Sequence, residues 1–530
     1  MWSRTMIAAT GAAVLLAGCG AGDGDDTSAE QERTPIEDGT FRGAITGDPG
    51  NLDPHMTVLS ITRWVTTFMY DSLIFIDEDG EAVPYLAESW DVELDRVTYT
   101  LKDGITCTDG TELTASDVAE NVEFVADPAN ESPQLGVWVQ PGVTATADDD
   151  ARTVTITSPG PDPFLLQGSG LMQIVCPAGM ADRSILEEGS SGTGMFELVD
   201  FVAGDHYTFE RRDEYAWGPE GASAADPGTP QTVTLDVVAN ESTAANMFLA
   251  GDLDVVDLTG ADIDRVEQSG AARLELPALF GELFFNQTDG RPGADPAVRQ
   301  ALAHATDFEA VGMALTDGRG QPAEGLGVLD PQVCSADTVS ETIPEHDVEA
   351  AEALLDDAGW EEGSDGVRSK NGEPLALSLT YLSEMGPGVS AGSELLAQQW
   401  EAVGARVELE PITQTQINEV VFGSGDWDAA LIRLTVAFPS QLIPFFSGPV
   451  PPEGTNFAHL DNEEYQELTA QAAQLPVEEG CPLWEDADRA LVSNADVIPF
   501  VDEVRSLFLD GVEVRLLANN YVPPSIRLYE

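Results

Sequence analysis

The sequence predicts a mixed α/β fold with large hydrophobic cores. A strand, a helix and a strand follow one another between Val233 and Val256, which is the pattern of a βαβ unit. Strands and helices alternate again from residue 348 to residue 434. Such alternation is typical of a largely parallel sheet covered by helices, with ligands bound beyond the strand ends. The 530 residues are 42% apolar, which is enough to fill several cores.

Near the N-terminus, residues 70–125 show a different pattern of short strands and turns that leads into one helix. Strands are expected at 73–76 and 97–101. A turn that contains Asp-Gly follows each of them, at 78–80 and at 108–110. Thr114 can cap the helix, and Asp117 three residues later completes a capping box. The apolar stripe of this helix consists of Val118, Val122 and Val125. The stretch therefore predicts a β-meander closed by a helix.

The same stretch carries an ordered set of short motifs. They are Tyr70–Leu73, Val83–Trp90, Tyr99–Gly104, Asp109–Thr111 and Thr114–Val118. In this order and spacing they resemble the signature of the family 5 extracellular solute-binding proteins, which are the peptide, nickel and opine receptors of ABC importers. Further motifs of that family follow at Gly192–Leu198, Glu210–Trp217, Ala250–Val256, Asp295–Leu302, Gly425–Leu431 and Val497–Phe500.

This resemblance implies a two-lobed fold like that of the type II periplasmic binding proteins, with an additional α+β subdomain in the first lobe. Hinge strands would join the lobes, and Leu283–Asn286 matches the family's crossover. The expected boundaries are 40–72, 190–283 and 500–530 for lobe I, 73–189 for the subdomain and 284–499 for lobe II.

Residues 1–18 have the pattern of an export signal, with a positive charge at Arg4 and an apolar run from Met6 to Leu16. That run is too short to span a bilayer. Leu16-Ala17-Gly18-Cys19 resembles a lipobox, which predicts a lipid on Cys19 rather than a plain cleaved signal peptide. Residues 19–39 are expected to form a flexible acidic linker. The protein would be anchored to the outer face of the cytoplasmic membrane.

The charge balance excludes some partners. Ninety-four acidic residues against 23 basic ones give a formal charge of −71, which argues against binding nucleic acid or anionic lipid. Adaptation to high salt and a generally acidic secreted protein explain this charge equally well.

Four further cysteines follow Cys19, and an even number in an exported protein favours disulfides over metal ligation. Each of the pairs Cys107–Cys176 and Cys334–Cys481 falls within one domain implied by the resemblance, so these pairs are expected. Two other pairings stay open. We expect no metal site and no cofactor.

The resemblance also implies ligand contacts on both lobes. Thr57 follows the loop that faces the ligand in the family, and Asn286 lies on the hinge strand. For the isolated His55 of that loop, a structural turn is the favoured interpretation. Peptide-binding members have an aspartate that pairs with the peptide's α-ammonium where this sequence has Ala437, so ordinary dipeptide binding is in doubt.

Three other candidates each allow two interpretations. Arg433 either meets a substrate carboxylate or forms a structural ion pair, of which the ion pair is favoured. Trp138 and Phe438 either stack on the ligand or pack in a core.

The expected function is capture without chemistry: a monomer binds a peptide-like solute between its lobes, closes, and docks on the permease subunits of an importer. The alternative is a surface receptor that senses a peptide, a metal chelate or an oligosaccharide without import. A secreted hydrolase is least favoured, because the five histidines are scattered and no GxSxG or HExxH motif occurs.

Overall fold

The computed structural model describes residues 33–57, 59–77, 80–187, 189–329, 332–385, 387–413 and 416–530. The expected signal peptide, Cys19 and most of the linker lie outside these residues. The chain from Pro35 to Glu530 forms one compact unit.

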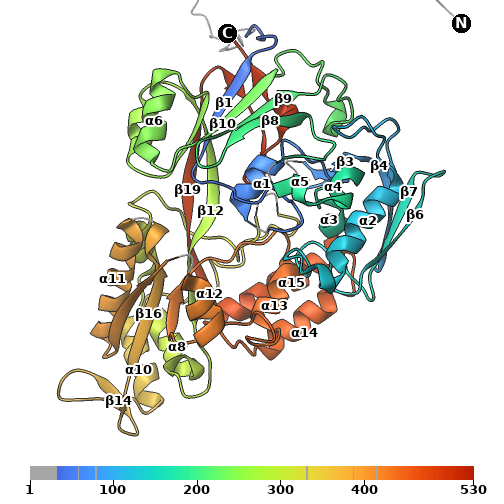
Figure 1. Ribbon diagram of the computed structural model, residues 1–530. Coiled ribbons are helices and arrows are strands. Elements are labelled where there is room, and N and C mark those ends of the chain that lie inside the picture. Colours follow the sequence, from blue (N-terminus) through green and yellow to red (C-terminus); the bar gives the residue numbers. More distant parts are fainter. Residues whose placement is uncertain are drawn as a thin grey trace, which may run out of the picture. The chain divides into compact units, whose positions relative to one another are not determined.

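Lobe I contains a four-stranded sheet in the order β1-β10-β9-β8 (Figure 1). Strand β1 runs parallel to β10, and the other two pairings are antiparallel. The bounds are β1 Thr40–Ile45, β8 Phe196–Val202, β9 His206–Arg211 and β10 Thr232–Val237. Helix α1, Ser60–Thr66, follows the loop after β1.

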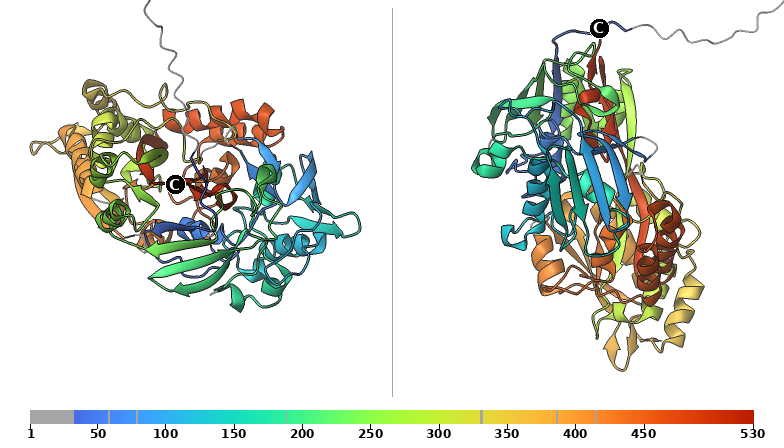
Figure 2. Two further views of the ribbon diagram at one scale, coloured as in Figure 1. Left: turned by 90° about the horizontal axis from the view of Figure 1, so that it is seen from above. Right: turned by 90° about the vertical axis from the view of Figure 1, so that its right-hand side faces the viewer.

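The subdomain is built on an antiparallel sheet in the order β4-β5-β7-β6, whose strands face the viewer in the right-hand view of Figure 2. Their bounds are Ala87–Glu93, Arg96–Leu101, Thr153–Thr157 and Thr144–Asp148. A short hairpin pairs β2, Ile74–Ile76, with β3, Ala82–Pro84. The remaining helices are α3 Leu165–Gly170, α4 Pro177–Ala181 and α5 Ser184–Glu187.

Helix α2, Ala115–Ala126, packs on this sheet and begins as the sequence predicts. The Thr114 hydroxyl accepts a hydrogen bond from the Asp117 backbone N–H, and the Asp117 carboxylate accepts one from the Thr114 N–H at 2.8 Å. Val118, Val122 and Val125 are completely buried. The predicted capping box and apolar stripe are therefore confirmed.

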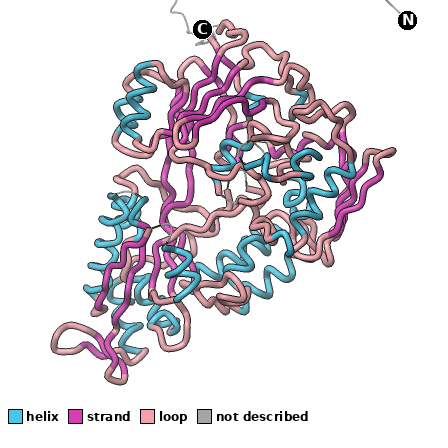
Figure 3. The backbone as a smooth tube through the Cα atoms, in the orientation of Figure 1, coloured by secondary structure: helices cyan, strands magenta, loops and turns pink. Residues whose placement is uncertain are grey.

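A six-stranded sheet joins the two lobes in the order β11-β19-β12-β18-β16-β17. Two long antiparallel strands, β12 (Ala272–Phe285) and β19 (Val497–Leu509), run from one lobe into the other as the continuous pair in Figure 3. The other strands are β11 Val255–Leu258, β16 Ala376–Leu382, β17 Arg406–Ile412 and β18 Ala429–Leu431. Only β18, β16 and β17 are parallel among these described strands, so the predicted largely parallel sheet holds for one half of it.

The predicted βαβ unit between Val233 and Val256 is wrong. Strand β10 lies in the four-stranded sheet, whereas β11 pairs antiparallel with β19. Helix α6, Glu241–Ala250, connects them, and its N-cap is Asn240. The partner of β11 comes from the far end of the chain, and a local pattern of strand, helix and strand carries no information about it.

The helices of lobe II cover its half of the six-stranded sheet. Asp295 caps helix α8, since its carboxylate accepts a hydrogen bond from the Ala297 N–H at 3.1 Å. Between β17 and β18 the short helix α12 is followed by a π-helical turn, Val420–Ser424. The main helices are α8 Pro296–His304, α9 Phe308–Leu315, α10 Val348–Asp357, α11 Pro387–Ala402, α12 Ile417–Glu419, α13 Ile443–Phe446, α14 Glu463–Ala472 and α15 Val477–Ser493.

The buried apolar residues divide along the long strands. One core joins lobe I and the subdomain, including Phe41, Phe68 and Tyr99, and others lie in lobe II from Leu283 onward. The expected boundaries at 283/284 and 499/500 fall inside β12 and β19, which continue unbroken through them.

Candidate functional site

A small apolar cluster links the subdomain with lobe II. It consists of Phe164, Cys334, Phe438, Ala472 and Trp484, and we call it the bridge cluster. The ring of Phe438 stacks on that of Phe164, with centroids 5.1 Å apart and planes at 10°. Phe164 immediately precedes α3 of the subdomain, whereas Phe438 follows β18 of lobe II. The two lobes therefore share buried apolar surface at this point.

Trp138 lies beside the bridge cluster. Its ring is 6.4 Å from that of Phe438 in an edge-to-face arrangement, and the guanidinium carbon of Arg63 lies 4.8 Å from the Trp138 ring. Arg63 is on α1 of lobe I, and its Nη2 donates to the Leu171 carbonyl at 3.2 Å. The structure thus brings Trp138 and Phe438 together and adds Arg63, which no motif in the sequence had indicated.

The Trp138 backbone and the Phe438 ring can lie close to α3 because residue 168 is a glycine. A Cβ atom at this position would lie 2.7 Å from the Trp138 carbonyl oxygen and 3.6 Å from the Phe438 ring. A polar contact also fixes the approach, because the Gln441 amide donates to the Val137 carbonyl at 2.5 Å. Only glycine leaves room for the Trp138 backbone here.

Two further predicted ligand contacts, Ala437 and Arg433, already have partners within the protein. Ala437 is half-buried against the bridge cluster, and its N–H donates to Gln441 Oε1 at 2.7 Å. Arg433 forms an ion pair of 2.9 Å with Glu503 on β19, which is the structural alternative named for it. Its guanidinium lies 5.8 Å from the Phe280 ring.

Asn286 is completely buried within lobe II. Its amide donates to the carbonyls of Gly425 at 3.1 Å and Trp427 at 2.9 Å, and its oxygen accepts from the Thr288 hydroxyl at 2.7 Å. These bonds attach the end of β12 to the turn before β18. In the structure Asn286 therefore holds its own lobe together and is not among the residues around Trp138.

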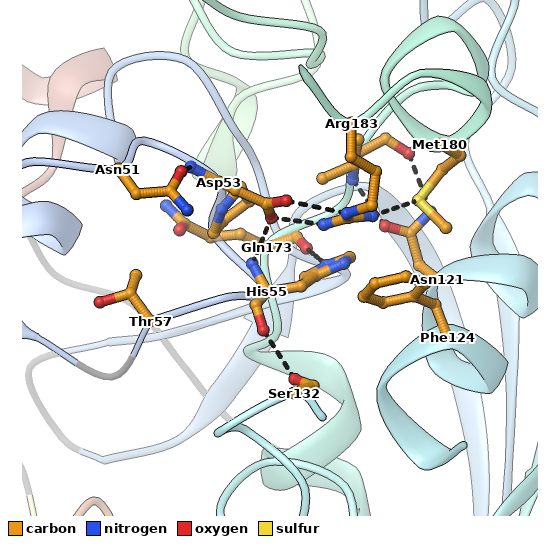
Figure 4. A network of polar contacts seen from close by, with 12 residues as sticks. Asn51, Asp53, His55, Thr57, Asn121, Phe124, Ser132, Gln173, Met180 and Arg183 are labelled. Atoms are coloured by element: carbon orange, nitrogen blue, oxygen red, sulfur yellow. Dashed lines mark hydrogen bonds and ion pairs between the residues drawn. The ribbon is translucent and has the colours of Figure 1, made fainter. Parts of the chain in front are cut away.

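The loop after β1 belongs to a polar network that includes Thr57 and His55 (Figure 4). The Thr57 hydroxyl accepts a hydrogen bond from the Leu59 N–H at 3.1 Å. His55 is completely buried, and its Nε2 lies 2.9 Å from the Gln173 carbonyl oxygen. Burial, together with the nearby Arg183 charge, lowers the pKa of His55 to about 4. His55 is therefore neutral at pH 7.

The same network anchors this loop to the subdomain. Asp53 pairs with Arg183, whose Nε lies 2.8 Å from the carboxylate. The Arg183 guanidinium lies 3.9 Å from the Phe124 ring of α2. These contacts give His55 and its neighbours a structural role.

A buried carboxyl group lies where β12 passes between the lobes. Glu282 is completely buried, and its Oε2 accepts a hydrogen bond from the Leu434 N–H at 2.9 Å. Its other oxygen has no hydrogen-bond partner in the part of the chain that is described. Burial raises the pKa of Glu282 to about 8, so the group is mostly protonated at pH 7.

Disulfides join Cys107 to Cys176 and Cys334 to Cys481, the same pairs that were expected. The second lies in the bridge cluster. Among the described residues, no group of three or more His, Cys, Asp or Glu side chains could hold a metal ion. Nor does any helix in those residues combine the length and apolar character needed to cross a bilayer.

Comparisons with known proteins agree on one family. The family model described as bacterial extracellular solute-binding proteins, family 5 Middle, matches residues 81–448. The nickel-binding periplasmic protein of Escherichia coli (strain K12) is 26% identical over 375 residues, which cover 68% of each chain. The glutathione-binding protein of the same strain is 25% identical over 471 residues, covering 85% of this chain and 86% of that one.

A solved structure shows the same fold. A substrate-binding protein from Microbacterium hydrocarbonoxydans, crystallised with 4-hydroxybenzoate hydrazide, superposes with a TM-score of 0.74 at 28% identity. The match covers 92% of this chain and 99% of that one. All three relatives are named as binding proteins, and the fold is the two-lobed fold of periplasmic binding proteins. The chain therefore belongs to family 5 of the bacterial extracellular solute-binding proteins, the substrate-binding components of ABC importers.

Proposed function

We propose that this protein binds a peptide-like solute between its two lobes and delivers it to the permease subunits of an importer, without chemistry. The observation that carries this proposal is the meeting of Trp138 from the subdomain with Phe438 from lobe II, beside Arg63 from lobe I. Aromatic faces and a cation supplied by different parts of the fold are suited to enclosing a small organic molecule.

The long strands β12 and β19 support a hinge for this capture. They are the continuous connections of the six-stranded sheet between the lobes, and their register shifts around Gly281. Bending about a few residues would separate Trp138 from Phe438 and expose both rings. A solute drives closure only if it binds the closed state more tightly than the open one.

The assigned regions follow from this arrangement. We place lobe I at 40–72, 190–283 and 500–530, the subdomain at 73–189 and lobe II at 284–499. Trp138, Phe438 and Ala437 are the proposed solute contacts, with Thr57, Asn286 and Arg433 as lesser candidates that already have partners within the protein.

Ala437 bears on the kind of solute. Peptide-binding relatives hold the ligand's ammonium group with an aspartate at this position, and an alanine offers no charge. A peptide-like solute would then be bound through its backbone, its carboxylate or an apolar group. Glutathione is a modified tripeptide, and the similarity to a glutathione-binding protein supports a solute of this size.

We also propose that the mature protein is a monomer held on the outer face of the cytoplasmic membrane by a lipid on Cys19. The Leu16-Ala17-Gly18-Cys19 sequence and the extracellular family support this location. Replacing Cys19 with alanine should release the protein from washed membranes into the soluble fraction. Equal retention of the wild type and C19A would contradict the anchor.

The direct test of the function is thermal unfolding of the mature protein in concentrated salt, with and without a pool of two- to six-residue peptides. A solute at 100 times its dissociation constant stabilises the folded state by about 2.7 kcal/mol. A higher unfolding midpoint supports peptide capture. No shift with peptides, together with a shift caused by another class of solute, would overturn the peptide-like assignment.

A further inference from the structure

Arg63 is a cation for which the described residues supply no ion-paired carboxylate, although the protein is strongly acidic. From Arg42 to Arg527, every other arginine in the described part of the chain has a carboxylate within ion-pair distance. With 94 acidic residues in the sequence, such a partner is easy to supply. Its absence at Arg63 therefore calls for an explanation.

The surroundings of Arg63 use little of its hydrogen-bonding capacity. The side chain is half-buried, and its one hydrogen bond within the described residues goes to the Leu171 carbonyl oxygen. A guanidinium group has five N–H donors arranged as a fork that fits a carboxylate with two parallel bonds. Most of this fork is therefore available to an oxygen ligand.

The charged side chain described next to this part of α1 is a second cation, not a carboxylate. Trp64, the next residue on α1, faces Arg505 of β19 at 5.3 Å, and Arg505 is paired with Asp257. Burial lowers the pKa of Arg63 to about 10, which leaves the group charged at neutral pH. A charge kept partly out of water without a partner is unfavourable, and a bound anion would relieve that cost.

The position of Arg63 connects it to the proposed solute site. Its guanidinium contacts the ring of Trp138, and that ring in turn contacts Phe438 from the opposite lobe. Trp138 is half-buried, so part of its surface remains available for contact with a ligand. A cation and a partly exposed indole side by side suit a molecule with one acidic end and an apolar body.

We infer that Arg63 binds the carboxylate of the captured solute and that the apolar part of the solute packs on Trp138. This inference rests on the proposed function and deepens it, because it selects solutes with a free carboxylate. The source of that group is either the C-terminus of a peptide or an organic acid that is not a peptide. The two sources share the same chemistry at Arg63.

The test compares matched acids and amides. The mature protein is titrated with two- to six-residue peptides that have a free or an amidated C-terminus, and with aromatic carboxylic acids and their primary amides. Unfolding midpoints identify the binders, and calorimetry gives their dissociation constants. The wild type should bind the acid at least tenfold more tightly than its amide. The series that binds identifies the source of the carboxylate.

The variant Arg63→Gln should lose this preference, with acid and amide binding within about threefold of each other. The matched control is Arg96→Gln, whose arginine forms an exposed pair with Glu93, and it should keep the full preference. Arg63→Lys retains the charge but loses the fork, so it should keep part of the preference. If R63Q does not fold, R63K decides, because unchanged acid binding in R63K would contradict a forked contact.

The outcomes separate the inference from the proposed function. If the wild type binds peptides and R63Q keeps the acid preference, the inference is overturned and peptide capture stands. Equal affinity of the wild type for acids and amides overturns it as well. If no member of either series binds the wild type, the peptide-like function fails and the inference fails with it.

Discussion

The ring of Phe438 lies parallel to the ring of Phe164, with centroids 5.1 Å apart, although the two residues belong to different lobes. Both are almost completely buried. Apolar packing at this contact therefore helps to hold the two lobes together. A solute bound beside this ring pair would add its own contacts between the lobes to the one that the protein already makes.

A double-mutant cycle measures this contact. Phe164→Ala and Phe438→Ala should each destabilise the protein, because each removes a buried ring. The double variant should be less destabilised than the sum by about 0.5–1.5 kcal/mol, the usual value of an aromatic pair. Denaturant unfolding of the four proteins gives the coupling. Strict additivity would contradict a direct contact between the lobes in solution.

Substitution of Gly168 tests the close approach of Trp138. In a helix, Ala is favoured over Gly by about 1 kcal/mol, but the added Cβ at this position would lie 2.7 Å from the Trp138 carbonyl oxygen. We expect Gly168→Ala to destabilise the protein and to weaken solute binding at least tenfold. The control is Gly160→Ala in the same subdomain, where an added Cβ meets no atom within 4 Å. Equal effects of the two substitutions would contradict the steric argument.

Glu282 predicts a fall in stability as the pH rises. Its pKa is raised by burial to about 8 in the folded state from the usual 4.5. The folded protein therefore binds more protons between these values, and the contribution of Glu282 is present in full below pH 4.5 and lost as the pH approaches 8. At about 1.4 kcal/mol per pH unit, up to about 5 kcal/mol is involved.

The variant Glu282→Gln retains an oxygen for the Leu434 N–H and cannot ionise. The stability difference between E282Q and the wild type should therefore increase in favour of the variant from pH 6.5 to pH 8. Both proteins contain His55 and the other titrating groups, so their contributions cancel and the comparison isolates Glu282. A difference that does not depend on pH would show that the carboxyl is already ionised or solvated.

His55 predicts the opposite sign at lower pH. Its pKa is lowered by burial to about 4 from the usual 6.5, so the unfolded chain binds more protons between these values. Its contribution to stability is present above pH 6.5 and is lost as the pH falls to about 4, by up to about 3 kcal/mol. His55→Gln can still donate to the Gln173 carbonyl. Unfolding of H55Q should lose less stability than the wild type from pH 6.5 to 5, and parallel curves would contradict a buried neutral histidine.

The two disulfides predict different effects on binding. They join residues 69 and 147 positions apart, and the loop-closure model gives about 4 kcal/mol of stabilisation for the shorter loop and about 5 kcal/mol for the longer one. Replacing Cys334 and Cys481 with serine should also weaken solute binding, because this bridge lies in the cluster that holds Phe438. The matched control replaces Cys107 and Cys176, which lie away from it. Calorimetry with one solute compares the two, and equal affinities would contradict the link.

Local features of this protein follow from the sequence alone. Thr114 and Asp117 are three residues apart, so their capping box depends on neighbours in the chain and could be predicted. Gly359 and Gly404 follow the ends of α10 and α11 with positive φ angles, which is the usual local signal for the end of a helix. The ordered motifs between Tyr70 and Val118 identified the family for the same reason, because they are short and contiguous.

The tertiary structure decided what depends on distant partners. Strand β11 pairs with β19 from the far end of the chain, which made the predicted βαβ unit wrong. Arg433 finds Glu503, and Phe438 finds Phe164, across separations that no periodicity reports. Arg63 is recognisable only in the fold, since the absence of a carboxylate partner among the described residues depends on everything packed around it. Sequence determines which groups are present, and packing determines which of them remain free to bind a solute.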